Sequence, residues 1–276
     1  MGVVSTVIAY CGTPVSPLEL WSRWRFDPWV LAVFATAVGL YIFGRSRMSQ
    51  SRVESASGSA LCFYTGTAIA LLALLSPLCA LSVSLFSARI TQHIVLLMIA
   101  APLLVAARPL DVWSFALRRH SANAAIAKRS SRSHPMIAAG VFAIVVWAWH
   151  TPLLYAATFD GNVAYWLMHI SMFTCAFALW SALLDRAGDP WERMLAGLAS
   201  AVQMGLLGAL ITFAPHPLYS PHFLTTDAWG MAPLQDQQLG GVIMWVPGCG
   251  LFLLVALLDM WRALSNPSAL SRLQAR

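Results

Sequence analysis

The chain has 276 residues, of which 59% are hydrophobic and only 10% are charged. A soluble domain carries about 25% charged residues, so this composition argues against a soluble globular protein and indicates an integral membrane protein. The net charge of +6 does not by itself indicate a nucleic-acid partner, because the distribution of basic residues between loops matters more than their sum. We expect the lipid bilayer as a partner and no nucleic acid.

The N-terminal stretch has neither a basic segment nor an uninterrupted apolar core, so no cleavable signal peptide is expected. The cysteines are scattered and form no CxxC motif or paired spacing. This pattern argues against a disulfide framework and against a thiolate zinc site. The cysteines are Cys11, Cys62, Cys79, Cys175 and Cys249.

Seven apolar runs follow along the chain, most of them close to the roughly 20 residues that a transmembrane helix needs. They show no alternation at period two, which favours helices over the strands of a barrel. The predicted fold is therefore an all-α integral membrane protein, a bundle of seven transmembrane helices that forms a single domain over residues 1–276. The predicted spans are residues 28–44, 60–81, 90–107, 136–155, 163–184, 194–214 and 239–259.

The basic residues predict the orientation of this bundle. Every Lys and Arg except Arg23, Arg25 and Arg89 falls in alternate connections or after the last span, on the side that the positive-inside rule assigns to the cytoplasm. We therefore expect the N-terminus outside and the C-terminus in the cytoplasm. Residues 121–133 are small, polar and basic, as expected of a flexible cytoplasmic loop.

The fourth run contains the segment IVVWAWHTPLLY, residues 144–155, which carries one histidine, His150, among mostly apolar neighbours. Polar groups in membrane spans are costly unless paired, so they are functional candidates by default. Pro152, two residues later, removes a backbone donor and loosens the helix there.

His93 in the third span and His169 in the fifth lie at a similar depth to His150, each roughly 5–9 Å below the outer surface at 1.5 Å per residue. Three imidazoles from three spans predict a shared polar or metal site if these helices are neighbours, and imidazole suits copper and zinc. The alternative for each histidine taken singly is a hydrogen-bonded residue near a span end.

The remaining histidines fall in connections. His216 and His222 lie in an outer loop that contains no Lys or Arg, where they are either metal ligands or simply solvated. His120 and His134 lie in or beside the basic cytoplasmic loop and are expected to be solvated.

Sulfur ligands are a further possibility, because thioether sulfur is soft and selects Cu(I). Met168 and Met172 flank His169 in the fifth span, and Met98 and Met244 also lie on outer helix halves. Methionine is also an ordinary packing residue. Cys79, near the outer end of the second span, is a weaker candidate.

The segment QDQQLGGVIMWVPGCG, residues 235–250, begins the seventh span. Asp236 is either a metal ligand or an acidic residue favoured by the dipole at a helix N-terminus. Gly240 and Gly241 allow close helix approach. Pro247 and the glycines around it predict a kink or break within the span.

No catalytic pattern accompanies these residues: GxSxG, HExxH, a Walker loop and paired intramembrane carboxylates are all absent. We therefore do not expect an enzyme. Within the predicted spans the sequence shows no buried Lys or Arg, and Asp or Glu only at their ends. This argues against transport driven by a charge at mid-membrane.

Five segments in order resemble the membrane-embedded CtaG family of cytochrome c oxidase assembly factors, which is associated with caa-type oxidases. The resemblance covers residues 90–258, and the first two spans contribute little to it. The segments are TQHIVLLMIAAPLL (Thr91–Leu104), WHTPLLYAA (Trp149–Ala157), WLMHISMFTCAFALW around His169, PHPLYSPH (Pro215–His222) and DQQLGGVIMWVPG (Asp236–Gly248).

The resemblance implies a multi-pass factor of the bacterial cytoplasmic (inner) membrane that acts as a chaperone, delivering or inserting copper during maturation of a haem–copper oxidase. Its partners would be cytochrome c oxidase subunits and a periplasmic copper chaperone. The matching motif residues are His93, His150, His169, Asp236, Gln237, Gln238, Pro102 and Pro152. The sequence departs from the family pattern at Arg89, where a second histidine often precedes the position of His93.

Residue pattern and resemblance together predict a copper site on the extracytoplasmic side. His93, His150 and His169 would form the main site, and Met168 or Met172 would supply soft ligands. His216, His222, Asp227 and Asp236 would capture the ion or hand it over. Two alternatives remain open: a non-catalytic scaffold that binds haem through facing histidines, and a copper permease.

Overall fold

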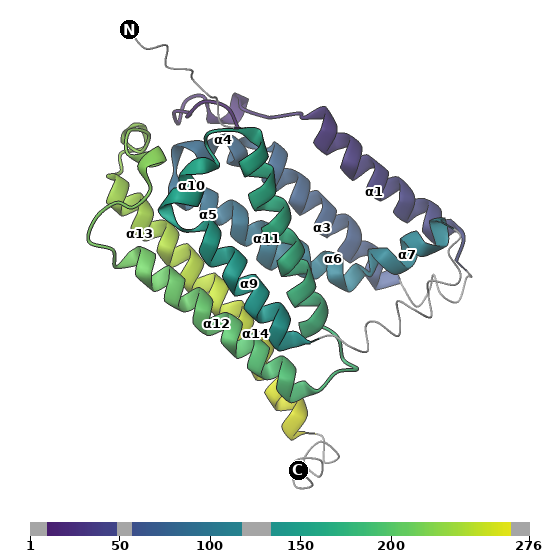
Figure 1. Ribbon diagram of the computed structural model, residues 1–276. Coiled ribbons are helices and arrows are strands. Elements are labelled where there is room, and N and C mark those ends of the chain that lie inside the picture. Colours follow the sequence, from purple (N-terminus) through teal and green to yellow (C-terminus); the bar gives the residue numbers. More distant parts are fainter. Residues whose placement is uncertain (1–9, 49–56, 118–133, 266–276) are drawn as a thin grey trace.

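The computed structural model describes residues 10–48, 57–117 and 134–265, and all regular structure in these ranges is helical (Figure 1). The expected all-α fold is therefore confirmed. The basic loop at residues 121–133 lies outside the described residues, as do His120 and the other basic positions Arg52, Arg118, Arg119, Arg272 and Arg276. The longer helices are α1 (Pro28–Ser46), α3 (Ser57–Leu75), α9 (Pro135–Trp149), α11 (Asn162–Leu183), α12 (Pro190–Thr212), α13 (Pro233–Ile243) and α14 (Gly250–Leu264).

Shorter helical elements complete the chain. Two of them, η2 and η5, are π-helical, and the others are short α-helices or single 3-10 turns. They are η1 (Leu20–Ser22), α4 (Pro77–Ser84), α5 (Phe86–Ile94), η2 (Val95–Ala100), α6 (Ala101–Ala107), α7 (Pro109–Ala116), α10 (Pro152–Ala157), η3 (Ser220–His222), η4 (Asp227–Trp229) and η5 (Met244–Cys249).

Proline begins most of the α-helices, including α1, α4, α9, α10, α12 and α13. It is suited to the first helical position because its ring fixes φ and its missing amide would have no partner there. Asp27, Ser76 and Asp189 stand directly before α1, α4 and α12, and their side chains accept hydrogen bonds from backbone amides of the first turn. Local sequence therefore sets where these helices start.

Five continuous helices among the described residues are long and apolar enough to cross a membrane. They are α1, α11, α12, the run α5–η2–α6 (Phe86–Ala107) and the run α13–η5–α14 (Pro233–Leu264). A sixth span is obtained if α3 and α4, which meet at an angle of 48°, count as one. The remaining predicted span corresponds to α9, which is apolar but has only 15 residues.

The predicted fourth span does not continue through Pro152. Helix α9 ends at Trp149, and Thr151 adopts the extended conformation that a residue before proline favours. His150 therefore lies between two helices, at the C-cap of α9. The tyrosine hydroxyl of Tyr219 donates to the freed carbonyl of His150 at 3.0 Å.

The seventh span also differs in form from the predicted kink or break. The chain stays helical through Pro247 and widens into the π-helical segment η5, a rearrangement that accommodates a residue without an amide donor. A second π-helical segment, η2, directly follows α5. The indole of Trp180 donates to the carbonyl of Leu97 within η2 at 2.8 Å, which ties this segment to α11.

The predicted span ranges contain no Lys or Arg, but two arginines are buried in the helices that extend beyond those ranges. Arg89 in α5 is fully buried, and Arg193 in α12 is buried against Asp259 of α14 with an N–O distance of 3.3 Å. Both arginines lie just before the predicted start of a span, and the helices begin earlier than the apolar runs do. The apolar run thus underestimates the buried length of each helix.

The expectation that the cysteines are unpaired was also wrong for two of them. Cys11 and Cys79 form a disulfide with their Cα atoms 5.3 Å apart. Because 68 residues separate them, no local spacing could indicate the pair. The bond joins the N-terminal segment to α4, and Cys79 is therefore not a free thiolate ligand.

The helices form one bundle in which α1 and α12 lie on opposite sides (Figure 1). Helix α1 begins at the upper end of this view and α14 ends at the lower end. Helix α12 packs on α9, α13 and α14, α11 packs on α9 and α6, and α5 packs on α4 and α13. The largest buried cluster lies between α5, α9, α11, α12 and the run α13–α14, and the candidate site lies inside it.

Candidate functional site

Three helices bring His93, His150 and His169 together. His93 is in the last turn of α5, His150 caps α9, and His169 is in the second turn of α11. All three side chains are buried. His93 lies between the other two, with its ring centroid 5.9 Å from that of His150 and 5.4 Å from that of His169.

Each outer ring is oriented by its own helix. The Nδ1 atom of His150 lies 2.7 Å from the carbonyl of Val146, and that of His169 lies 3.0 Å from the carbonyl of Tyr165, four residues earlier in both cases. A carbonyl oxygen only accepts, so Nδ1 must carry the proton in both rings. Each Nε2 is then left with a free lone pair, as in metal-binding histidines whose other nitrogen is held by a backbone carbonyl.

The free nitrogens have no hydrogen-bond partner among the residues that the structure describes. Nε2 of His150, Nε2 of His169 and both ring nitrogens of His93 are buried and unpaired. Buried polar atoms without partners are uncommon in native structures, and leaving one unpaired costs about 1–3 kcal/mol. Four such atoms in neighbouring rings make these histidines candidates for binding a ligand.

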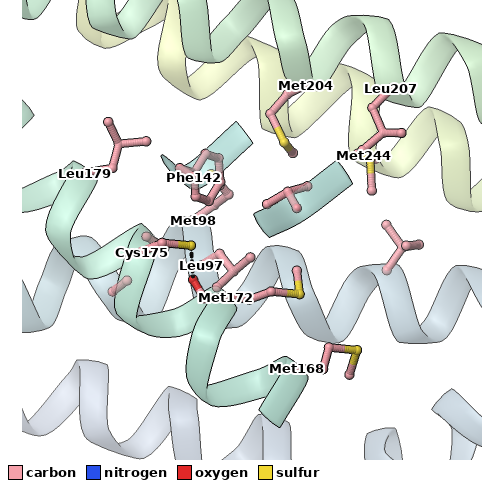
Figure 2. Close-up of a cluster of buried hydrophobic side chains, with 14 of the residues drawn as sticks. Leu97, Met98, Phe142, Met168, Met172, Cys175, Leu179, Met204, Leu207 and Met244 are labelled. Atoms are coloured by element: carbon pink, nitrogen blue, oxygen red, sulfur yellow. Dashed lines mark hydrogen bonds between the residues drawn. The ribbon is translucent and has the colours of Figure 1, made fainter. Parts of the chain in front are cut away.

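A small cavity adjoins these rings. It has room for about one water-sized sphere, and two of the histidines and three methionines contribute to its wall. Figure 2 shows Met172, Met204 and Met244 with their side chains directed toward the same interior region, from α11, from α12 and from the start of η5. The lining residues are Ile90, His93, Ile94, Leu97, Val146, His150, Met172, Met204 and Met244.

The methionines that line the cavity are only partly those predicted from the sequence as sulfur ligands. Met172 lines the cavity, whereas Met168 is buried in the same cluster without lining it. Met204 was not selected, because it is one apolar residue in the middle of an apolar helix and its sequence neighbours distinguish it in no way. Met244 was noted as a methionine on an outer helix half, but the sequence did not connect it with His93.

The outer-loop histidines do not join this cluster. His216 is exposed, and its backbone carbonyl accepts from the Gln237 side chain at 3.4 Å. His222 is buried, and its Nε2 lies 2.7 Å from the hydroxyl of Tyr155. Burial and the positive charge of Arg89 lower the pKa of His222 to about 3, so this ring is neutral at physiological pH.

Asp236 does not lie in the histidine cluster, and its side chain binds the N-terminus of α5 instead. Its carboxylate accepts from the backbone amides of Phe86 and Ser87, at 2.6 and 3.1 Å, and from the Ser87 hydroxyl. These amides are at the open N-terminus of α5, where a negative charge also complements the helix dipole. The side chain of Gln237 holds the outer loop by accepting from the amide of Leu218.

Tyr165 connects the disulfide with the histidine cluster. The hydroxyl of Tyr165 is 3.4 Å from the sulfur of Cys11 and 3.8 Å from that of Cys79. The ring of Tyr165 in turn packs on His169, with 4.2 Å between the centroids. The disulfide thus ties the N-terminal segment to α4 next to Tyr165 and the histidine cluster.

The side chains around the cavity offer ligand atoms that suit copper better than a hard metal ion. Within the described ranges, no group of three or more His, Cys, Asp or Glu side chains is arranged to hold a metal ion. Imidazole nitrogens together with thioether sulfurs, however, are the ligands that soft Cu(I) accepts. The residues present can therefore supply nitrogen from His93 and His150 and sulfur from Met172, Met204 or Met244.

Comparison of the sequence with known protein families finds one match. The family described as "Cytochrome c oxidase caa3 assembly factor" (CtaG) matches residues 39–266. No curated protein and no solved structure matched the chain. The match includes the spans α3 to α14, and so extends beyond the segments that carry the resemblance in the sequence.

Proposed function

Because the chain belongs to the caa3-type cytochrome c oxidase assembly factors, we propose that it holds copper among His93, His150 and His169 and assists its insertion into the oxidase. On this proposal the protein is a seven-span chaperone of the bacterial cytoplasmic membrane and not an enzyme. Its N-terminus is outside, and copper is its cargo rather than a resident cofactor.

The unpaired imidazole nitrogens are the observation that carries this proposal. His150 and His169 each present an Nε2 lone pair beside His93, whose two ring nitrogens have no hydrogen-bond partner in the described ranges. A structural role would leave these atoms paired with protein groups. A metal ion bound by these rings would take one nitrogen of His93 together with Nε2 of a neighbouring histidine.

The thioethers favour copper over zinc. Met172, Met204 and Met244 surround the same small cavity as His93 and His150, and thioether sulfur selects Cu(I). The cavity has room for about one water-sized sphere, which suits an ion and is far too small for haem. This size favours copper over the haem-scaffold alternative.

The disulfide supports the proposed orientation. Disulfides persist in oxidising compartments and are rare in the cytosol. Cys11 and Cys79 lie at the end of the bundle where the N-terminal segment meets α4. The histidine cluster lies toward this same end, through Tyr165. An outward-facing site is where a copper donor outside the cytoplasm has access.

We further propose that the outer loop guides the ion inward. His216 is exposed at the surface and is available for capture. His222 is buried on Tyr155, and both lie in a loop without basic residues. We assign Asp236 and Gln237 to positioning α5 and the loop, because hydrogen bonds occupy their side chains.

Complementation tests the function. Cells that lack this factor are given the wild-type chain or His93→Ala, His150→Ala or His169→Ala, and oxidase activity and copper content are measured. We expect each variant to reduce both by at least about tenfold, with restoration by added copper. Asn162→Ala, at the start of α11, is the control and should behave as wild type. Full oxidase copper with all three histidine variants would disprove the role.

Two further measurements distinguish the proposed chaperone from a haem-binding scaffold and from a copper permease. A haem protein would show a Soret band after purification, and we expect none. A permease would load copper into sealed vesicles, whereas a chaperone binds it without accumulation inside them.

A further inference from the structure

Arg89 is a buried charge beside the histidine cluster. It lies in α5 one turn before His93, and its side chain is fully excluded from the surface. Residues four apart on a helix lie on the same face, about 5–6 Å apart at Cβ. Within the described part of the chain no acidic side chain forms an ion pair with it.

The contacts of Arg89 hold a cation without neutralising it. Its Nε donates to the carbonyl of Ser82 at 3.3 Å, and Nη1 donates to the Thr158 hydroxyl at 2.9 Å. Nη2 is buried and has no hydrogen-bond partner among the described residues. The guanidinium also lies 4.2 Å from the ring of Phe159 and 5.7 Å from that of Tyr165, and such aromatic faces attract cations. An arginine stays protonated in proteins, so a full positive charge remains here.

Tyr165 and His169 form a short series of contacts between Arg89 and His93. The ring of Tyr165, which faces Arg89, packs at 4.2 Å on His169, and His169 packs at 5.4 Å on His93. Arg89, Tyr165, His169 and His93 are all buried. Electrostatic interactions are stronger in such surroundings than in water.

An unneutralised charge at this place discriminates between ions by their charge. The Coulomb energy scales with the product of the charges, so a divalent ion is repelled twice as strongly as a monovalent one at the same position. We propose that Arg89 makes the site selective for the monovalent ion Cu(I) and excludes Cu(II) and Zn(II). This inference rests on the proposed function and specifies the oxidation state of its cargo.

Metal competition on the purified full-length protein tests the inference. Affinities for Cu(I), under anaerobic conditions with a competing chelator, and for Zn(II) are compared in wild type, Arg89→Met, Arg89→Gln and Arg89→Lys. We expect wild type to prefer Cu(I). Arg89→Met and Arg89→Gln should bind Zn(II) more tightly and lose at least about tenfold of the preference. Arg89→Lys keeps the charge and should retain the preference.

The outcomes separate this inference from the proposed function. If wild type binds Cu(I) but the preference is unchanged in both neutral variants, the role of Arg89 is wrong while the copper site stands. Loss of preference in Arg89→Lys equal to that in Arg89→Met would also overturn it, because shape and not charge would then be responsible. Equal affinity of wild type for Zn(II) and Cu(I) overturns it even if no variant folds. A wild-type protein that binds no Cu(I) overturns both proposals.

Discussion

The Nδ1 contacts of His150 and His169 distinguish these side chains from histidines that merely fill space near a span end. A neutral imidazole has one donor and one acceptor nitrogen, and the carbonyls of Val146 and Tyr165 occupy the donor in each ring. The acceptor nitrogen is then buried, and no donor from the described part of the chain meets it. The sequence predicted the common depth of these residues, but the free nitrogen depends on ring orientation, which no spacing reveals.

Replacement of the cavity methionines tests the contribution of sulfur. Met204→Leu and Met244→Leu conserve volume and should cost less than about 1.5 kcal/mol of stability, yet each removes a soft ligand. We expect Cu(I) affinity to fall by about tenfold in either variant, measured by competition with a chelator.

Met98→Leu is the matched control, because Met98 is buried in the same cluster without lining the cavity. Its Cu(I) affinity should equal that of wild type. Equal affinity in all three variants would remove the methionines from the site and leave the histidines alone.

At the scale of elements, helix α13 sets the position of α5 and therefore of His93. Asp236 accepts from the first amides of α5, and Gly240 lies one turn later against the same helix. A Cβ atom at Gly240 would come within 2.5 Å of the Phe86 ring. The sequence predicted close approach at this glycine, but it did not identify α5 as the partner.

The two glycines Gly240 and Gly250 give a direct test of this contact. Gly240→Ala forces Phe86 to move and should cost about 1–3 kcal/mol, seen as a lower Tm in detergent together with weaker copper binding. Gly250→Ala adds the same group where no atom lies within 4 Å, and should leave both quantities unchanged or raise the Tm slightly. Equal Tm values for the two variants would contradict the close approach of α13 to α5.

Helix boundaries followed from the sequence where local chemistry decides them. Pro28, Pro135 and Pro190 each begin a helix close to a predicted span. The π-helical segments η2 and η5 could not be predicted in the same way, because they depend on partners from other helices, such as the indole of Trp180. Pro247 indicated an irregularity, but its form was set by packing.

At the scale of the whole molecule, orientation rests on the distribution of basic residues and on the disulfide. Reporter fusions test it. A fluorescent protein fused after the last residue, Arg276, should fluoresce, and alkaline phosphatase at the same place should be inactive, since the C-terminus is proposed to be cytoplasmic. Fusions in the outer loop at Leu224, which is highly exposed, are the control. There the fluorescent protein should be dark and alkaline phosphatase should be active. Reversed activities would contradict the orientation and would place Cys11–Cys79 in a reducing compartment.

The sequence predicted the helical fold, five of the apolar spans and the three histidines that lie together, because these depend on composition and on depth along single helices. It did not predict Met204, the disulfide or the capping role of Asp236. Each of these depends on pairing between segments that are distant in the chain, as with Cys11 and Cys79. The buried charge of Arg89 was missed because α5 begins before its apolar run does.

Copper stoichiometry of the purified full-length protein tests the central claim most directly. Protein is loaded with Cu(I), freed of weakly bound ion and analysed by mass spectrometry of intact chains, for wild type, the triple variant His93→Ala, His150→Ala, His169→Ala, and the control His216→Ala. We predict one tightly bound Cu(I) in wild type and in His216→Ala, and none in the triple variant. Equal copper in wild type and the triple variant would contradict a copper site among the three histidines.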